Sequence, residues 1–570
     1  MAYKRLGDLL TSVGAISEEQ LNTALALQKE SKKRLGSILI ESGIITEDQL
    51  IETLQLQLGV DYIDLAAFRI QPDLAQALSK NIARKYTVIP VKNTTDEIHI
   101  AMADPMNFMA IEEVKAATHK RVVPLIARQH EIERAISNLY GTKGATQALE
   151  DLEREMGAST SAISSFQGPL TTNIAEDTNS APTIRLVNSI IERAITDEAS
   201  DIHLEPREET LVVRMRVDGV LRVALTIPRT SQSAVISRIK IMGNMDIAER
   251  RVPQDGRANV RIRNMNIDLR ISTLPTIYGE KVVIRLLNKS GMQMTTSGIG
   301  LEGKNLTKYN RLMSNSNGVI LLVGPTGSGK TSTLYTMIHQ LNTDEVNLVT
   351  LEDPVEYNVA GINQVQINDK TGLTFAGGLR SILRQDPDIV AIGEIRDGET
   401  AEIAMRAAIT GHLVLSTMHT NDAIASLDRL IDIGVEPYLI ASAVKGIISQ
   451  RLVRRVCPHC NEKYDATDTE LDFLGIPHTD ENGNRTQLTR GKGCPYCNGT
   501  GYRGRIAVFE ILMLTNDIAN LVHRNAPHEE LLEKIYASDF EPMVVNCRKF
   551  ALNGITSSEE AFRILNTTEM

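Results

Sequence analysis

The fold is decided by the stretch Val319-Ile320-Leu321-Leu322-Val323-Gly324-Pro325-Thr326-Gly327-Ser328-Gly329-Lys330-Thr331. It is a short apolar strand followed by G-x-x-x-x-G-K-T, and residues 332–338 after it are typical of a helix. This order predicts an NTPase loop in which backbone N–H groups and the helix dipole hold phosphates. We expect Lys330 to reach the β- and γ-phosphates and the Thr331 hydroxyl to hold Mg²⁺. The predicted ATP-binding residues are Gly324, Pro325, Thr326, Gly327, Ser328, Gly329, Lys330 and Thr331.

The composition limits the classes of protein to which the chain can belong. With 570 residues and a hydrophobic fraction of 42%, it is long enough for roughly three or four domains. The net charge of -10 and an aromatic fraction of 4% argue against nucleic acid as a partner, because such binding needs cationic surface and stacking side chains. No signal segment is recognisable, and no apolar run approaches the roughly 18 residues of a membrane span. We expect a cytoplasmic protein whose membrane contact is indirect.

Four segments are expected along the chain, which we assign to a multidomain α/β fold class. Residues 1–145 combine a helical part with a small α/β part, and the small polar residues of 146–180 predict a flexible linker. Residues 181–290 form a middle α/β domain. Residues 291–570 alternate strands and helices after the phosphate loop, which predicts a mostly parallel sheet covered on both faces.

The N-terminal segment contains an internal repeat. Its copies span residues 5–28 and 34–57, with a constant offset (34 − 5 = 29). Each copy begins R-L-G-x-x-L, passes a glycine and an N-cap residue, Ser17 or Thr46, and continues into a longer segment with helical periodicity. The repeat therefore predicts two helix–turn–helix units.

Two further strands end in carboxylates. The strand from Leu348 leads to Glu356, and the Walker B pattern of residues 386–394 ends at Glu394. Ligands bind beyond the C-terminal ends of parallel strands, so one carboxylate there can hold Mg²⁺ and another can activate the attacking water. We predict that Glu394 activates water and that Glu356 is its partner at the metal. Solvated carboxylates at strand ends are the alternative.

A third strand is flanked by His412 and His419, which as a pair are candidates for sensing the γ-phosphate; a lone His is more often structural. Arg270 and Arg285 lie on strand-like segments of the middle domain. An Arg supplied from that domain could neutralise charge in the transition state, although the residues alone favour ordinary surface arginines.

Four of the five cysteines form two C-P-x-C knuckles: Cys457 with Cys460, and Cys494 with Cys497. Two such turns suit a tetrahedral Cys₄ Zn²⁺ site, in a subdomain of residues 457–497. Four unrelated buried cysteines are the alternative. Cys547 is expected to be a small core residue.

In combination, the motifs GPTGSGKT (324–331), TLEDPVE (350–356), RQDPDIVAIGEIRD (384–397) and TGHLVLSTMHTND (410–422), with the cysteine knuckles, resemble the secretion-superfamily hexameric ATPases that power type IV pilus extension and type II secretion. The resemblance implies a RecA-like ATPase domain, a PAS-like middle domain, and a homohexamer that acts with a polytopic inner-membrane platform protein. It also implies that Arg270 and Arg285 are arginine fingers, and that His412 and His419 belong to the family's His box.

The duplicated block resembles the cyclic di-GMP-binding domain of the ATPases that drive mannose-sensitive haemagglutinin (MSHA) pili. The resemblance implies that arginines and glutamines of the block contact guanines and phosphates and that its leucines pack against the bases. A helical docking module, in which the leucines are only core, is the alternative. The implied residues are Arg5, Leu6, Gly7, Leu10, Leu25, Gln28, Arg34, Leu35, Gly36, Leu39, Leu54 and Gln57.

These expectations combine into one hypothesis: a hexameric ATPase that drives MSHA-type pilus extension at the inner membrane. Its cofactors are Mg²⁺ with ATP and a structural Zn²⁺, and cyclic di-GMP is its regulatory ligand. A type II secretion ATPase without cyclic di-GMP control is the first alternative. A nucleic-acid motor is disfavoured by the net acidity of the chain.

Overall fold

The computed structural model describes residues 10–11, 16–31, 35–42, 44–66, 68, 70–136, 139–140, 182–262, 265–288, 295–480 and 483–565. Contacts divide the chain into two compact units. The first comprises residues 1–286 and 494–498, and the second comprises residues 287–493 and 499–570. The predicted linker and the candidate ligands Arg5, Leu6, Gly7 and Arg34 lie outside the described residues.

The N-terminal repeat is visible in how two helices begin. Ser17 Oγ accepts a hydrogen bond from the Gln20 backbone N–H at 3.1 Å, and Thr46 Oγ1 accepts one from the Gln49 N–H at 3.2 Å. In both copies the glutamine side chain accepts from the N–H of the cap residue in return. These reciprocal bonds are capping boxes, so the predicted caps are confirmed at both positions. The helices are α2 (Glu18–Ser31), α3 (Leu35–Glu41) and α4 (Glu47–Leu58).

A small three-stranded sheet follows the helices. Its order is β1-β2-β3, with β1 antiparallel to β2 and β2 parallel to β3. Alternation along β2 buries Ile98 and Ile100 in a core shared with Val114 of the neighbouring helix. The elements of this part are η1 (Pro72–Gln76), α5 (Lys80–Tyr86), β1 (Val88–Asn93), β2 (Glu97–Met102), α6 (Phe108–Thr118) and β3 (Arg121–Ile126).

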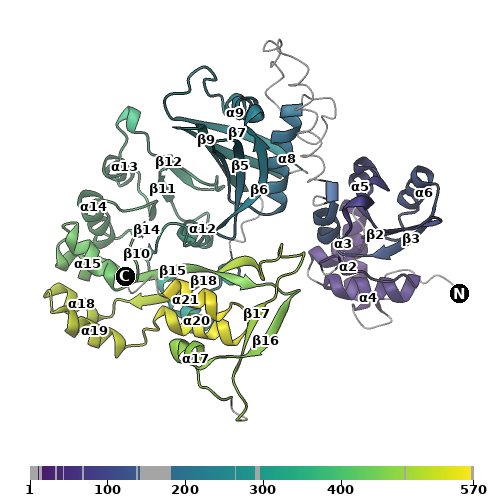
Figure 1. The fold of residues 1–570 in the computed structure, drawn as a ribbon. Coiled ribbons are helices and arrows are strands. Elements are labelled where there is room, and N and C mark those ends of the chain that lie inside the picture. The colour runs from purple at the N-terminus through teal and green to yellow at the C-terminus, as the bar shows by residue number, and fades with distance from the viewer. Residues whose placement is uncertain are drawn as a thin grey trace. The chain divides into compact units, whose positions relative to one another are not determined.

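The middle part is a six-stranded sheet with strand order β6-β5-β4-β9-β8-β7. Helix α8 buries the face that carries Leu186 and Ile190 against the sheet, and α9 packs beside it (Figure 1). Strands β7 and β8 form an antiparallel hairpin, with Asn259 of β7 opposite Asp268 of β8. The elements are α8 (Pro182–Thr196), β4 (Asp201–Pro206), β5 (Thr210–Val217), β6 (Val220–Pro228), α9 (Arg229–Met242), β7 (Gln254–Ile262), β8 (Met265–Thr276) and β9 (Gly279–Asn288).

The second unit is built on a seven-stranded sheet of order β12-β11-β13-β14-β10-β15-β18, parallel except for β18 (Figure 1). Every residue of β10 is buried, and its side chains alternate between two cores. Leu321 packs with α13 and α14 on one face, and Leu322 packs with α11 and α12 on the other. The prediction of a mostly parallel sheet covered on both faces is therefore confirmed.

The second unit contains the following strands and helices. The strands are β10 (Gly318–Val323), β11 (Leu348–Glu352), β12 (Asn363–Gln366), β13 (Ile389–Ile392), β14 (Leu413–Met418), β15 (Val444–Val456), β16 (Asn461–Asp465), β17 (Gln487–Gly491) and β18 (Tyr502–Met513). The helices are α10 (Thr296–Ile299), α11 (Gly303–Met313), α12 (Lys330–Leu341), η2 (Asp369–Thr371), α13 (Phe375–Ile382), α14 (Gly398–Ile409), α15 (Ala425–Asp432), α16 (Pro437–Ala443), α17 (Asp468–Leu474), α18 (Asn516–His523), α19 (His528–Tyr536), α20 (Met543–Leu552) and α21 (Ser558–Leu565).

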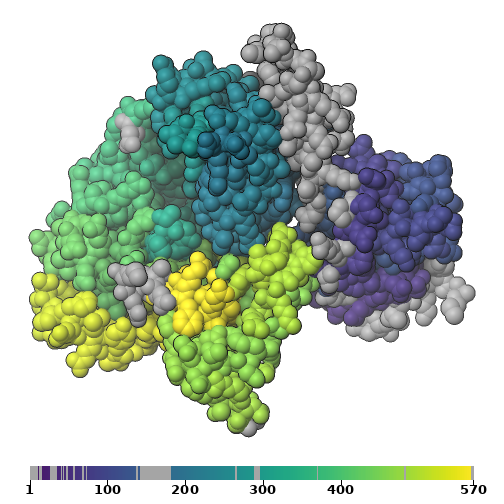
Figure 2. Space-filling view, viewed as in Figure 1, coloured from purple at the N-terminus to yellow at the C-terminus, as the bar shows by residue number. Residues whose placement is uncertain are grey.

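Strands β15 and β18 form a long antiparallel ribbon at one edge of this sheet. Beyond the sheet the ribbon packs with α17, α20 and α21 around a separate core that includes Val453, Leu471 and Phe550. Figure 2 shows the yellow C-terminal residues packed directly against light-green residues of this subdomain. Among the described residues, no helix is both long enough and apolar enough to cross a membrane.

Candidate functional site

The phosphate loop joins β10 to α12, and its three glycines, Gly324, Gly327 and Gly329, all have positive φ, which other residues rarely adopt. Gly324 has φ 144°, and a Cβ added there would lie 2.5 Å from the carbonyl oxygen of Gln450. Gly329 has φ 90°, and its added Cβ would lie 3.0 Å from Gln450 Nε2. Because a side chain at either position would strain the backbone and collide with β15, these glycines set how closely the loop approaches that strand.

Lys330 is the first residue of α12 and is folded back into the loop. Its Nζ donates to the carbonyl oxygens of Gly324 at 2.6 Å and Pro325 at 3.2 Å. Burial lowers the pKa of Lys330 to about 8, and the negative charge of Glu394 offsets part of that effect. An ammonium group held by loop carbonyls in this way can exchange them for phosphate oxygens.

Glu394 and His419 follow the neighbouring parallel strands β13 and β14, at the edge where the phosphate loop leaves β10. Glu394 Oε2 lies 3.4 Å from His419 Nε2, and its Oε1 pairs with Arg396. Partial burial, followed by the charge of Lys330, lowers the pKa of His419, so its ring is neutral at pH 7. The site therefore combines a carboxylate that can take a proton from water with a neutral imidazole and a buried ammonium group.

Glu352 is the last residue of β11, and its carboxylate accepts hydrogen bonds from neighbouring side chains. The Tyr335 hydroxyl donates to its Oε2 at 2.6 Å, and Gln364 Nε2 donates to its Oε1 at 3.1 Å. Both oxygens of the buried Glu352 carboxylate therefore accept hydrogen bonds from protein groups. Glu352 lies at the start of the acidic loop that leads to Glu356. Glu356 itself is half-buried four residues further along, so it remains the candidate of this loop for the metal.

His412 does not lie where the pairing with His419 predicted. It precedes β14, whose first residue Leu413 is level with Gly318 at the start of β10, whereas Met418 is level with Val323, next to the phosphate loop. A strand rises about 3.3 Å per residue, so the two histidines are roughly 20 Å apart. His412 Nδ1 lies 2.9 Å from the carbonyl oxygen of Ala407, in a structural contact. The expectation that both histidines flank the phosphates of one site is therefore corrected.

The two candidate arginine fingers lie on adjacent strands of the middle sheet. Arg285, on β9, has an exposed side chain whose Nε donates to Asp201 Oδ1 at 3.2 Å. Arg270, on β8, lies opposite Arg257 of β7. Their role as arginine fingers remains a prediction.

Sequence reasoning missed Gln450, the nearest neighbour of the phosphate loop on β15. Its side chain is fully buried, and its Nε2 donates to the Ser328 carbonyl oxygen at 2.9 Å. The available signal was the polar run Ser449-Gln450-Arg451 between the apolar pairs Ile447-Ile448 and Leu452-Val453, because buried polar side chains need partners.

The four knuckle cysteines come together as the spacing predicted. One ligand atom from each of Cys457, Cys460, Cys494 and Cys497 lies within 4.8 Å of the others. The Gly493 N–H donates to Cys460 Sγ at 3.3 Å, and the Cys494 N–H donates to Cys497 Sγ at 3.2 Å. Backbone donors of this kind favour thiolates, so the residues fit a Cys₄ Zn²⁺ site.

The described members of the N-terminal motif have different environments. Leu10 and Leu39 are fully buried with Ile16 and Ile45, and Leu54 is 8% exposed. Leu25 is 37% exposed. Leu10 and Leu39 therefore contribute to the core of the N-terminal helices, and contact with the bases stays a prediction for the motif. The other described members are Leu35 and Gln28, both half-buried, Gly36, which is buried, and Gln57, which lies on α4.

Two family profiles match the chain. The Type II/IV secretion system protein family matches residues 176–563, and the MshEN domain matches residues 58–146. The chain belongs to the Type II/IV secretion system protein family and carries an N-terminal MshEN domain. The MshEN match begins immediately after the duplicated block.

Two relatives with ATPase names show the activity of the chain. The chain is 40% identical to the type IV pilus assembly ATPase PilB of Myxococcus xanthus (strain DK1622) over 558 residues, 98% of each chain. It is 41% identical to the type II secretion system ATPase E of Vibrio cholerae over 464 residues, 81% of this chain and 90% of that protein. The protein is therefore an ATPase. The solved structure of the ATPase DotB from Yersinia pseudotuberculosis is 20% identical in sequence to this chain. The match covers 70% of this chain and 95% of the DotB chain, with a TM-score of 0.51, which shows a shared fold.

Proposed function

We propose that this ATPase is a homohexameric motor that extends a type IV pilus of the MSHA type at the cytoplasmic face of the inner membrane. The alignment with a pilus assembly ATPase over 98% of both chains carries this proposal. The secretion ATPase of Vibrio cholerae aligns with 81% of this chain, so the pilus relative accounts for more of it. The ring passes its motion to a polytopic inner-membrane platform protein.

The proposed chemistry uses the residues at the C-terminal edge of the parallel sheet. Lys330 and the loop N–H groups bind the phosphates, and Thr331 with Glu356 holds the Mg²⁺ of Mg-ATP. Glu394 orients and deprotonates the attacking water, with His419 beside it. Arg270 and Arg285 neutralise charge that develops on the transferred phosphoryl group.

Binding of cyclic di-GMP to the N-terminal domain is the regulatory part of the proposal. The MshEN match and the duplicated block that precedes it support this idea. A ligand with two equivalent halves suits a duplicated motif, and arginine offers a planar charged fork for phosphates and guanine edges.

An assay of the full-length protein, with and without cyclic di-GMP, tests the proposal. We expect the ligand to stimulate ATP hydrolysis. Calorimetry should show that Arg34→Ala loses cyclic di-GMP binding, whereas Arg121→Ala, on the exposed surface of the same domain, retains it. ATPase activity without stimulation or ligand binding would support the type II secretion alternative. Strong stimulation by DNA would instead support a nucleic-acid motor.

A further inference from the structure

Strand β15 is parallel to β10 and carries three consecutive buried polar residues, Ser449, Gln450 and Arg451. Burying such groups costs free energy unless they form hydrogen bonds. Gln450 and Arg451 donate hydrogen bonds to two different loops. Both loops lie at the edge of the sheet where the phosphate loop leaves β10.

Gln450 lies against the phosphate loop at Ser328, through its side chain, and at Gly324, through its backbone. Its side-chain Nε2 donates to the Ser328 carbonyl oxygen at 2.9 Å. Its backbone carbonyl oxygen is the atom nearest to a Cβ added at Gly324. The Oε1 atom of Gln450 accepts no hydrogen bond within the described part of the chain. The amide therefore contributes one donated bond, to the backbone of the loop that holds the phosphates.

Arg451, the next residue, holds the loop that follows β14. Its Nη2 donates to the Asn421 carbonyl oxygen at 3.1 Å, two residues beyond His419. Glu510, on β18, accepts from the Ala423 N–H at 2.9 Å. The His419 loop is thus fixed from the β15–β18 ribbon.

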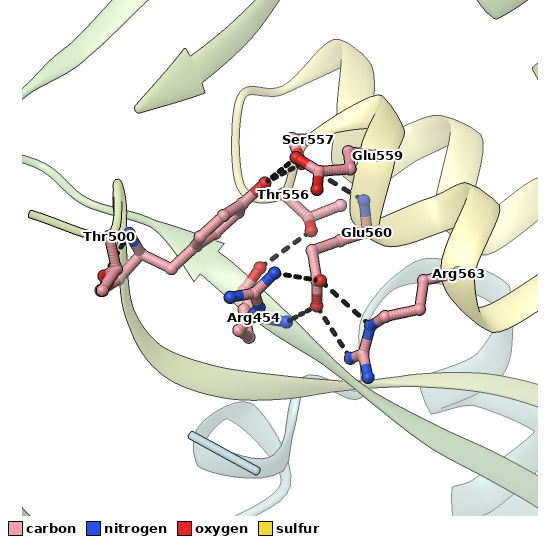
Figure 3. A network of polar contacts seen from close by, with 8 residues as sticks. Arg454, Thr500, Thr556, Ser557, Glu559, Glu560 and Arg563 are labelled. Carbon is pink, nitrogen blue, oxygen red and sulfur yellow. Dashed lines mark hydrogen bonds and ion pairs between the residues drawn. The ribbon is translucent and has the colours of Figure 1, made fainter. Parts of the chain in front are cut away.

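The ribbon is itself anchored further along β15. Arg454 pairs at 2.7 Å with Glu560, whose side chain is fully buried (Figure 3). The Arg454 guanidinium also lies 4.0 Å from the ring centroid of Tyr502. Glu560 also accepts from Arg563, and Thr556 Oγ1 donates to the Arg454 carbonyl oxygen. Because this network joins β15 to α21, the strand is a fixed support for the two loops.

We infer that Gln450 and Arg451 are positioning residues for ATP hydrolysis. Gln450 holds the phosphate loop through the Ser328 carbonyl, and Arg451 holds the His419 loop through the Asn421 carbonyl. One strand thereby sets the position of the nucleotide-binding loop relative to the Glu394–His419 pair. The part that concerns Arg451 rests on the proposed role of His419.

Steady-state kinetics of the full-length protein test the Gln450 assignment. Gln450→Met keeps the shape of the side chain, removes the donor and also removes the unpaired Oε1, so the fold should survive. We expect KM for ATP to rise about tenfold, the equivalent of one buried hydrogen bond left unmade, with a smaller change in kcat, because phosphates are held in the ground and transition states alike. Gln487→Met, which removes an exposed bond to Asp465, is the matched control and should leave both constants unchanged.

Either an unchanged KM or a loss confined to kcat would overturn the assignment. If Gln450→Met does not fold, Gln450→Leu serves, since its side chain also cannot donate to the Ser328 carbonyl oxygen; a wild-type KM for that variant would also overturn the assignment.

Arg451 has its own test. Arg451→Met should lower kcat at least tenfold with little change in KM, and Arg451→Lys should restore much of the loss, because an ammonium group can still donate to the Asn421 carbonyl oxygen. Arg455→Met, on the exposed side of the same strand, should leave kcat unchanged. Equal losses for Arg451→Lys and Arg451→Met would contradict positioning by a hydrogen bond. If His419→Ala retains full activity, the proposed chemistry fails, but the Gln450 assignment stands.

Discussion

Glu394 Oε2 and His419 Nε2 lie 3.4 Å apart beyond the ends of two neighbouring parallel strands, where the charge of Lys330 also reaches His419. The charge of Lys330 contributes to the lowered pKa of His419, and the charge of Glu394 counters the lowering of the Lys330 pKa by burial. The three side chains therefore form one electrostatic unit, in which the loss of the Glu394 charge alters the protonation equilibria of both Lys330 and His419.

Replacement of the carboxylate should separate catalysis from binding. Glu394→Gln should lower kcat by about 10²- to 10⁴-fold, the usual contribution of a positioned general base, while Lys330 still binds ATP at pH 7. Single-turnover hydrolysis and binding of a fluorescent ATP analogue measure the two effects. Glu399→Gln, an exposed carboxylate on α14, is the matched control. Near-normal hydrolysis by purified Glu394→Gln would remove Glu394 from the catalytic role.

The lowered pKa of Lys330 predicts a pH dependence. The folded-state pKa is about 8 against 10.5 ordinarily, so burying the ammonium group destabilises the fold below pH 8, and this penalty is relieved as the pH rises toward 10.5. Phosphate binding changes in the opposite direction because it needs the charged lysine. We expect kcat/KM for ATP to fall about tenfold per pH unit above pH 8, since this ratio reports the free enzyme.

Lys330→Arg provides the check on that assignment. A guanidinium group stays charged, so any residual activity of this variant should lack the decline between pH 8 and 9.5. A wild-type kcat/KM that remains level through pH 9.5 would mean that Lys330 does not titrate in this range.

The N-terminal leucines divide into two groups that mutagenesis can distinguish. Leu39 is fully buried, so Leu39→Ala should lower the free energy of unfolding by about 2–5 kcal/mol. Leu25 is 37% exposed, so Leu25→Ala should change it by only about 0.5 kcal/mol yet weaken cyclic di-GMP binding. Chemical denaturation and calorimetry give the two readouts. Unchanged ligand affinity for Leu25→Ala would show that this leucine does not pack against the bases.

Local sequence signals predicted much of the fold. The phosphate loop, the capped helices after Ser17 and Thr46, and the cysteine knuckles each depend on a few neighbouring residues whose conformations are set by backbone sterics or short-range hydrogen bonds. The parallel sheet followed from the alternation of strands and helices, because parallel strands need crossover connections.

Features that depend on register or on distant contacts were not predictable in the same way. His419 follows the C-terminal end of its strand, the edge where a parallel sheet binds ligands, but only the structure shows that this strand, β14, lies directly beside β10. Gln450 is 122 residues from Ser328 in sequence, and its role depends on β15 lying beside β10. A single sequence does not specify which strands become neighbours, so both assignments needed the structure.

The cysteine cluster predicts a metal content that can be measured directly. Elemental analysis of the purified protein should find about one zinc per chain, since four thiolates complete a tetrahedral site. Cys457→Ser should lose the zinc and lower the melting temperature, because ligand bonds that exist only in the folded state stabilise it. Cys547→Ser is the matched control: Cys547 is also buried, and burial raises the pKa of its thiol to about 12, so it should be an inert core residue whose loss leaves the zinc in place. Wild-type protein without zinc, or equal zinc loss in both variants, would contradict the Cys₄ assignment.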